Sequence, residues 1–123
     1  MQASPTERSQ PPPSPVDGIF RALSDPTRRH VLERLTAKQA SVSELAAPYS
    51  MALPSFLEHL KVLESCGLVQ SRKTGRVRTY RLAPGGLKIA EDWLGKQRTL
   101  WEQRLDRLDD YLLTLKAQQE TKK

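Results

Sequence analysis

The stretch that decides the fold covers residues 41–68 and reads SVSELAAPYSMALPSFLEHLKVLESCGL. Its first four residues, SVSE, have the spacing of a capping box, in which a serine and a glutamate three residues later satisfy free N–H groups at a helix start. Pro48 cannot continue a helix, because proline has no N–H and clashes with the preceding turn. The pattern predicts a helix of about two turns that starts at Ser41 and ends at Pro48.

The second half of this stretch predicts a longer partner helix over residues 54–66. Apolar residues recur at helical spacing at Leu53, Phe56, Leu60 and Leu63. Gly67 follows where a left-handed C-terminal cap would sit. Two short helices joined by a tight turn, with polar residues on the outer face of the second, form a helix-turn-helix.

Two more helices are predicted on the N-terminal side. Apolar residues at helical spacing indicate a short amphipathic helix over residues 16–23. Asp25 can cap the next helix, which has Pro26 at its first position, where a missing N–H costs nothing. The apolar residues of these two helices are Val16, Ile19, Phe20, Leu23, Val31, Leu32 and Leu35.

Residues 68–82 are predicted to form a β-hairpin, with strands at residues 68–73 and 76–82 and a turn at Thr74-Gly75. A hairpin directly after a helix-turn-helix is a wing. No Asp or Glu occurs between Glu64 and Glu91, and the basic residues in this interval are Arg72, Lys73, Arg76, Arg78, Arg81 and Lys88. Such a charge distribution favours contact with nucleic-acid phosphates, with a solvated charged hairpin as the alternative.

The chain is predicted to be helical after residues 84–86. A heptad series with one charged exception follows: Leu94, Arg98, Trp101, Leu105, Leu108, Leu112 and Leu115. A helix of about 30 residues is about 45 Å long, which exceeds what so small a domain can cover. The series therefore favours a subunit interface made with the N-terminal helix, and an intramolecular packing stripe is the alternative.

Length and composition limit the number of domains and the classes of protein to which the chain can belong. The chain has 123 residues, 37% of them hydrophobic, with 20 Lys and Arg against 14 Asp and Glu and a net charge of +6. The chain is long enough for at most one small domain, and domains of this size often gain stability by oligomerising. No apolar run reaches the roughly 18 residues of a membrane span, and the N-terminus lacks the apolar region of a secretory signal. We expect a cytoplasmic protein without a membrane partner.

The predicted fold is mainly α with a β-hairpin wing: a winged helix-turn-helix with a long C-terminal helix, over residues 16–118. Residues 1–15 hold five of the nine prolines and are expected to be a disordered tail. That tail is either a dispensable arm or a P-x-x-P ligand for a partner domain. Residues 119–123 are expected to be a second flexible tail.

No catalytic, metal or cofactor site is expected. One cysteine, Cys66, together with His30 and His59 is too few for a closed zinc site. No nucleophile with an acid partner accompanies His59, so an enzyme is not indicated. Cys66 is interpreted as a packing thiol rather than a redox sensor. Residues 85–86, Gly-Gly, lack the spacing of a nucleotide-binding loop.

Residues 19–35, IFRALSDPTRRHVLERL, resemble the opening signature of ArsR-type (ArsR/SmtB) winged-helix regulators. Residues 51–55 (MALPS), 59–64 (HLKVLE) and 67–69 (GLV) resemble the recognition helix of that family and its exit. The likeness runs from about residue 19 to residue 115. It implies a homodimeric DNA-binding transcriptional regulator, usually a repressor, whose first and last helices build the dimer.

Two departures from the family pattern bear on metal sensing. Metal-sensing members carry a cysteine pair in the helix before the recognition helix, whereas residues 43–48 here read SELAAP. Another common sensor site uses Asp and His on the last helix, and residues 106–115 contain aspartates but no histidine. Because soft divalent metals need Cys or His ligands, the resemblance implies a metal-independent branch with an unknown inducer.

The recognition helix departs as well. Where many members have a small hydroxyl and a basic residue, this chain has Leu57 and Glu58. Glutamate can accept a hydrogen bond from cytosine N4 and an apolar side chain can contact a thymine methyl, so both can read bases. The alternative is that DNA binding is weakened and the winged helix serves as a protein-interaction module.

These inferences assign residues to two surfaces. The residues expected to contact double-stranded DNA are Ser55, Leu57, Glu58, His59, Lys61, Arg72, Lys73, Arg76 and Arg78. The residues expected at the homodimer interface are Ile19, Phe20, Trp101, Leu105, Leu108, Leu112 and Leu115.

Overall fold

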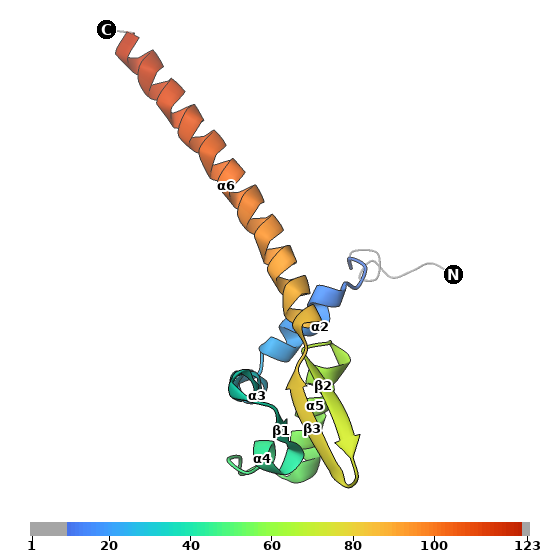
Figure 1. Ribbon diagram of the computed structural model, residues 1–123. Coiled ribbons are helices and arrows are strands. Elements are labelled where there is room, and N and C mark those ends of the chain that lie inside the picture. Colours follow the sequence, from blue (N-terminus) through green and yellow to red (C-terminus); the bar gives the residue numbers. More distant parts are fainter. Residues whose placement is uncertain (1–9, 122–123) are drawn as a thin grey trace. The chain divides into compact units, whose positions relative to one another are not determined.

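The computed structural model describes residues 10–121 of the chain (Figure 1). Its elements are α2 (Pro15–Leu23), α3 (Pro26–Ala37), β1 (Ala40–Ser41), α4 (Val42–Ala46), α5 (Leu53–Ser65), β2 (Val69–Thr74), β3 (Val77–Leu82) and α6 (Pro84–Thr121). Of the described residues, 10–90 form one compact unit and 91–121 form a second. The fold is a winged helix-turn-helix with a small antiparallel sheet, as the sequence predicts. Residues 1–9 of the expected N-terminal tail lie outside the described residues.

Capping residues lie at the starts of the two N-terminal helices. The Asp17 carboxylate accepts a hydrogen bond from the Ser14 backbone N–H at 2.9 Å, and α2 ends at Leu23. Asp25 precedes Pro26 and accepts from the Arg28 backbone N–H at 3.1 Å. The predicted cap of α3 is therefore confirmed.

The capping box of the helix-turn-helix is also confirmed. The Ser41 side chain accepts from the Glu44 N–H at 3.2 Å, and Glu44 accepts from the Ser41 N–H at 3.1 Å. However, α4 ends at Ala46 and is shorter than the predicted two turns. Ala47 keeps a helical conformation, but Pro48 has no N–H to extend the hydrogen-bond ladder.

The end of α5 is a complete Schellman motif. Gly67 has a φ of 80°, its N–H donates to the Glu64 carbonyl at 3.1 Å, and the Leu68 N–H donates to the Leu63 carbonyl at 3.0 Å. The predicted glycine cap is confirmed. One member of the predicted apolar face differs, because Leu53 lies at the first position of α5 and is 53% exposed.

The sheet has the order β1-β3-β2, with both pairs antiparallel. The register pairs Thr74 with Val77, so the turn residues are Gly75 and Arg76. The predicted turn at Thr74-Gly75 is therefore wrong by one residue. Gly75 has a φ of 62°, and a glycine at the first central position is the requirement of a type II′ hairpin turn.

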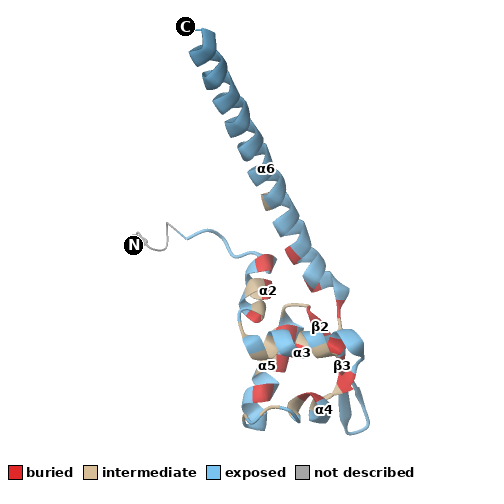
Figure 2. Cartoon of the chain, turned by 90° about the vertical axis from the view of Figure 1, so that its left-hand side faces the viewer, coloured by how far each residue is buried: buried red, intermediate tan, exposed pale blue. Residues whose placement is uncertain are grey.

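The buried residues of the first unit form one hydrophobic core, and Figure 2 shows them in red along the helices and strands of this unit. Its largest fully buried members are Phe56, Ile19, Leu45, Leu60, Leu63, Leu68, Val31 and Val69. Ile19 is 0% exposed within this unit, so it cannot line a subunit interface as the sequence predicts. The short helix buries Ile19 against its own core, whereas Phe20 beside it is half-buried.

Helix α6 is longer than predicted and supplies the whole second unit, residues 91–121. No Gly or Pro follows Gly95 to stop it, so residues 119–121 continue the helix where the sequence predicts a flexible tail. The apolar heptad residues of this unit are exposed (Figure 2), from 37% at Leu115 to 70% at Trp101. No helix in the described range has the apolar run that a bilayer span requires.

A close backbone contact in the first unit leads to a stability prediction. The Gly86 N–H donates to the Gly67 carbonyl at 3.1 Å, and a Cβ at residue 86 would lie 2.7 Å from the Gly67 oxygen. We expect Gly86→Ala to lower the free energy of unfolding by about 1–3 kcal/mol, because the backbone must shift. Urea denaturation followed by circular dichroism measures this change.

Gly85→Ala is the matched control, because a Cβ at residue 85 meets nothing within 4 Å. We expect this variant to be as stable as the wild type or slightly more so, since alanine favours the helix over glycine. Equal losses in both variants would show that the close approach at Gly86 is not the cause.

Candidate nucleic-acid interface

The second helix of the helix-turn-helix, α5, presents a polar outer face. Phe56, Leu60 and Leu63 anchor its inner face, each at most 1% exposed. The side chains expected to meet DNA lie beside and between these anchors along the helix. Of these, Ser55, Leu57, Glu58 and Lys61 are exposed. The structure therefore brings four of the five predicted α5 residues together on the open side of the helix.

His59, the fifth predicted residue, lies in a different environment. Its side chain is 21% exposed, and its Nδ1 lies 3.0 Å from Arg28 Nη1. Asp25 Oδ2 is 3.8 Å from the same nitrogen. The ring thus lies against the start of α3 rather than fully on the open face of α5.

Asp25 and Arg28 form the polar joint between α2 and α3. Burial opposes ionisation of Asp25, but the backbone hydrogen bond from Arg28 and the charge of the Arg28 guanidinium outweigh it and lower the pKa of this carboxyl. The Arg28 guanidinium donates to the carbonyls of Ala22 and Arg21 at 2.8 and 3.0 Å. These contacts add donors to carbonyls at the end of α2, where the Arg21 carbonyl also accepts from the Ser24 N–H at 3.2 Å.

Further side chains that sequence reasoning missed hold the turn between α4 and α5. The Tyr49 ring stacks on Phe56 with centroids 5.2 Å apart, and its hydroxyl lies 2.5 Å from His30 Nδ1. Arg34 donates to the carbonyls of Leu45 and Glu44 at 2.7 and 2.8 Å. The hydrogen-bonded partners lie 10–19 residues apart in sequence, so no local pattern indicates them.

The register of the wing separates its basic residues onto two faces. Cross-strand partners share a face, so Lys73 and Arg78 lie on one side of the hairpin. Arg72, which pairs with Thr79, lies on the other side with Arg81. Arg76 is at the turn. The basic residues of the predicted wing are thus exposed but do not form a single surface.

The face that carries Arg78 is linked to α5. The Ser71 hydroxyl donates to Glu64 Oε2 at 2.5 Å, and Arg78 Nη1 donates to the Ser71 oxygen at 2.8 Å. This chain of hydrogen bonds connects a basic wing residue to the recognition helix through one serine. The wing and α5 are therefore held together by polar contacts as well as by the core.

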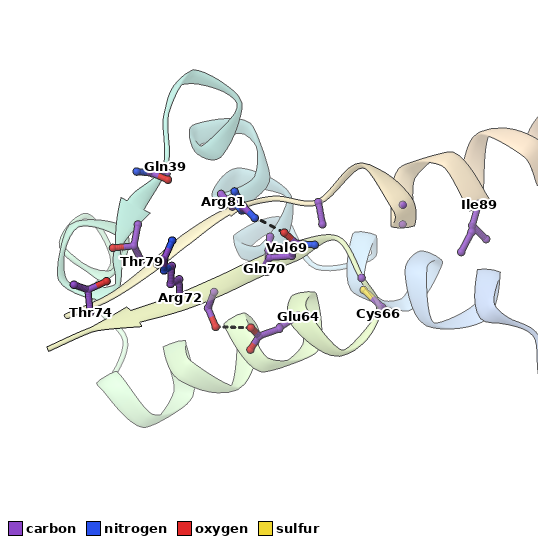
Figure 3. Close-up of a pocket in the computed structure, with 15 residues that line it drawn as sticks. Gln39, Glu64, Cys66, Val69, Gln70, Arg72, Thr74, Thr79, Arg81 and Ile89 are labelled. Atoms are coloured by element: carbon purple, nitrogen blue, oxygen red, sulfur yellow. Dashed lines mark hydrogen bonds between the residues drawn. The ribbon is translucent and has the colours of Figure 1, made fainter. Parts of the chain in front are cut away.

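The opposite face of the wing borders an open polar groove of about 1040 Å³ (Figure 3). Arg72, Thr79 and Arg81 lie along its length, and Arg81 Nε donates to Gln70 Oε1 at 3.2 Å. Cys66 lies at one end, where its Sγ contacts the Leu63 carbonyl at 3.4 Å. Burial raises the pKa of the Cys66 thiol, which favours the unreactive protonated form.

Across residues 10–121, no three His, Cys, Asp or Glu side chains gather in a cluster that could hold a metal ion. The same range contains one cysteine, which is unpaired by disulfide.

Comparisons with known proteins agree with this geometry. A family model described as "Helix-turn-helix domain" matches residues 23–72. The chain is 42% identical over 71 residues to the HTH-type transcriptional regulator Rv2034 of Mycobacterium tuberculosis. The aligned segment covers 58% of this chain and 66% of that protein. The match therefore spans just under two thirds of that relative.

Two solved structures share the fold. An ArsR family transcriptional regulator, RHA00566, is 49% identical with a TM-score of 0.71, over 75% of this chain and 95% of that one. The homodimeric winged helix-turn-helix DNA-binding domain Mb0332 of Mycobacterium bovis is 25% identical with a TM-score of 0.55, over 70% of this chain and 82% of that one. With its helix-turn-helix, its wing and this likeness, the chain belongs to the ArsR family of winged-helix transcriptional regulators.

Proposed function

We propose that the chain is a homodimeric, sequence-specific DNA-binding repressor that occupies an inverted-repeat operator without using a metal. The observation that carries this proposal is the open face of α5 beside the basic wing. Ser55, Leu57, Glu58 and Lys61 are exposed on a helix whose other side is buried. A helix of this kind fits the major groove, where its side chains can reach base edges.

The wing supplies the second contact. We propose that exposed Arg72, Lys73, Arg76 and Arg78 meet phosphates or the minor groove, from the two faces and the tip of the hairpin between which the register divides them. Phosphate contacts set affinity and register, while base contacts set sequence choice. In this proposal His59 contacts a phosphate or orients α5, because its ring is held against α3.

The second unit supports the homodimer. The apolar residues proposed for the interface are the exposed Trp101, Leu105, Leu108, Leu112 and Leu115 of α6 and the half-buried Phe20 of α2. A series of large apolar side chains at heptad spacing on one helix is buried most simply against a second copy. The homodimeric state of Mb0332 supports the same assembly. Two copies related by a two-fold axis would read an inverted repeat.

Metal independence rests on the donor set. The family's sensor positions hold Ala46 and Ala47 before the recognition helix, and residues 106–115 of α6 contain no histidine. Thiolate or imidazole ligands are what soft divalent ions need. The signal that releases this repressor is therefore of another chemical kind.

The test is a selection of genomic DNA fragments with the purified protein. We expect enrichment of one inverted repeat with fixed spacing, and unchanged affinity for it when stoichiometric zinc, cadmium or arsenite is added. Enrichment of no sequence would refute the proposed function. Release of the selected DNA by sub-micromolar metal would refute metal independence while leaving DNA binding intact.

A second function is favoured by one feature of α5. Glu58 places a negative charge on the face that would approach the phosphates, which weakens non-specific DNA affinity. In that case the winged helix would serve as a protein-interaction module. A chain that enriches no DNA yet forms the dimer in solution would support this alternative.

A further inference from the structure

One side chain, Arg28, touches three helices of the first unit. It belongs to α3, and its Nε and Nη2 donate to the Ala22 and Arg21 carbonyls near the end of α2 at 2.8 and 3.0 Å. Its Nη1 lies 3.0 Å from Nδ1 of His59 on α5. The planar fork of a guanidinium can serve all three partners at once.

The chemistry of this contact defines the state of His59. A guanidinium only donates hydrogen bonds, so His59 Nδ1 must accept and the ring proton must lie on Nε2. The Asp25 carboxylate, 3.8 Å from the same nitrogen, is beyond hydrogen-bond distance. The contacts found for His59 involve Nδ1, and no buried side-chain nitrogen in the described residues lacks a partner, so Nε2 is accessible and remains available as a donor.

We infer that Arg28 is a positioning residue for DNA recognition: its guanidinium holds His59 in the Nε2–H tautomer and fixes the orientation of α5 relative to α2 and α3. This inference rests on the proposed function, because it concerns how α5 meets DNA. Arg28 itself needs no contact with the nucleic acid.

The packing of the inner face of α5 shows why the hydrogen bond between Arg28 and His59 matters. Phe56, Leu60 and Leu63 hold the helix through apolar contacts, which are non-directional and tolerate small rotations. The Arg28–His59 hydrogen bond is directional, and His59 lies next to Glu58 in the same turn. Loss of this bond therefore changes where Glu58 and Lys61 point before it affects the core.

The experiment compares Arg28→Lys with Arg29→Lys. Both substitutions keep the charge, but lysine is a point donor and cannot span two carbonyls and an imidazole. Arg29 is the matched control, because its Nη1 also donates to a carbonyl at the end of α2, that of Leu23 at 2.7 Å, and the hydrogen bonds found for it do not reach α5. The DNA probe is the inverted repeat selected with the wild-type protein.

We expect Arg28→Lys to weaken binding by about tenfold, the scale of one charge-assisted hydrogen bond, and Arg29→Lys to stay within about twofold of the wild type. In a His59→Ala background, Arg28→Lys should add little, so the double variant should lose about tenfold rather than about a hundredfold. Additive losses, or equal losses in the two lysine variants, would overturn the inference.

The ¹⁵N NMR spectrum of the His59 imidazole tests the inference without DNA. At a pH where an ordinary imidazole is neutral, the wild type should show Nδ1 unprotonated, and Arg28→Lys should show a mixture of tautomers. A wild type that selects no DNA defeats the proposed function, and this spectrum alone then decides the inference. A protonated Nδ1 in the wild type would overturn it.

Discussion

Replacing Leu105 and Leu108 by glutamate is expected to convert the protein from a dimer into a monomer at micromolar concentration. Both side chains are about half exposed in the single chain, at 55% and 51%, so the substitutions leave the monomer fold intact. In the dimer they would place charges in an apolar seam. Each unpaired buried charge costs several kcal/mol, and about 4 kcal/mol already corresponds to about a thousandfold in the dissociation constant.

Sedimentation velocity and DNA binding measure the two consequences. The double variant should sediment as a monomer with an unchanged circular dichroism spectrum, and it should no longer bind the full inverted repeat tightly, because a monomer reaches only one half-site.

Leu113→Glu is the matched control for this experiment. Leu113 is 65% exposed and lies on the same helix outside the heptad series. This variant should remain dimeric. A wild type that is monomeric at micromolar concentration, or a Leu113→Glu variant that dissociates like the double variant, would contradict the proposed interface.

Local signals in the sequence account for most of the fold. The capping box of Ser41 and Glu44 and the glycine cap at Gly67 depend on residues within a few positions of one another, and both form as predicted. Asp25 and Pro26 define the start of α3 in the same way. Such features can be predicted from the sequence because each depends on a hydrogen bond between residues within one helical turn.

Features that depend on distant partners could not be predicted in this way. Strand β1 has two residues, which is too short for any periodicity, and it exists because Ala40 pairs with Tyr80. Helical spacing marks Ile19 as apolar but cannot say which partner buries it, so the core and the subunit interface look alike in sequence. The faces of the wing depend on a register that a one-residue change in the turn would invert.

The site shows the same limit at the level of single side chains. His59 lies among the polar residues of α5 in sequence, and its contact with Arg28, 31 residues earlier, appears only in the fold. The contrast between His59 and Glu58, adjacent in the chain but in different surroundings, is set by the 100° step of the helix. The apolar side chains that anchor α5 in the core determine which of these two residues points toward the core.

The second large effect concerns how the wing and α5 divide the work on DNA. Arg76 is exposed at the tip of the hairpin, where it is proposed to contact phosphate. Arg76→Ala should weaken binding to all sequences alike and flatten the dependence of log K on log salt by about 0.9 per lost contact, hence about 1.8 for the dimer. Fluorescence anisotropy titrations at several salt concentrations measure this slope.

Arg81→Ala is the control for the wing. Arg81 carries the same charge on the groove face, where it donates to Gln70, and it is not among the proposed contacts. Its replacement should leave the salt slope unchanged. A slope that falls equally in both variants would mean that the wing acts through its net charge rather than through a contact at its tip.

Glu58→Ala should act differently, because an exposed carboxylate on α5 attracts no phosphate. If Glu58 accepts a hydrogen bond from a cytosine, its loss should relax the preference at one position in each half-site, with about 1–3 kcal/mol of discrimination at stake. Binding to the other positions should keep its sequence preference, and the two half-sites should remain about 34 Å apart or a multiple of that distance. Selection with the variant reports the preference at every position. Tighter binding to every DNA with no altered preference would show that Glu58 only repels phosphates, and the protein-interaction alternative would then gain support.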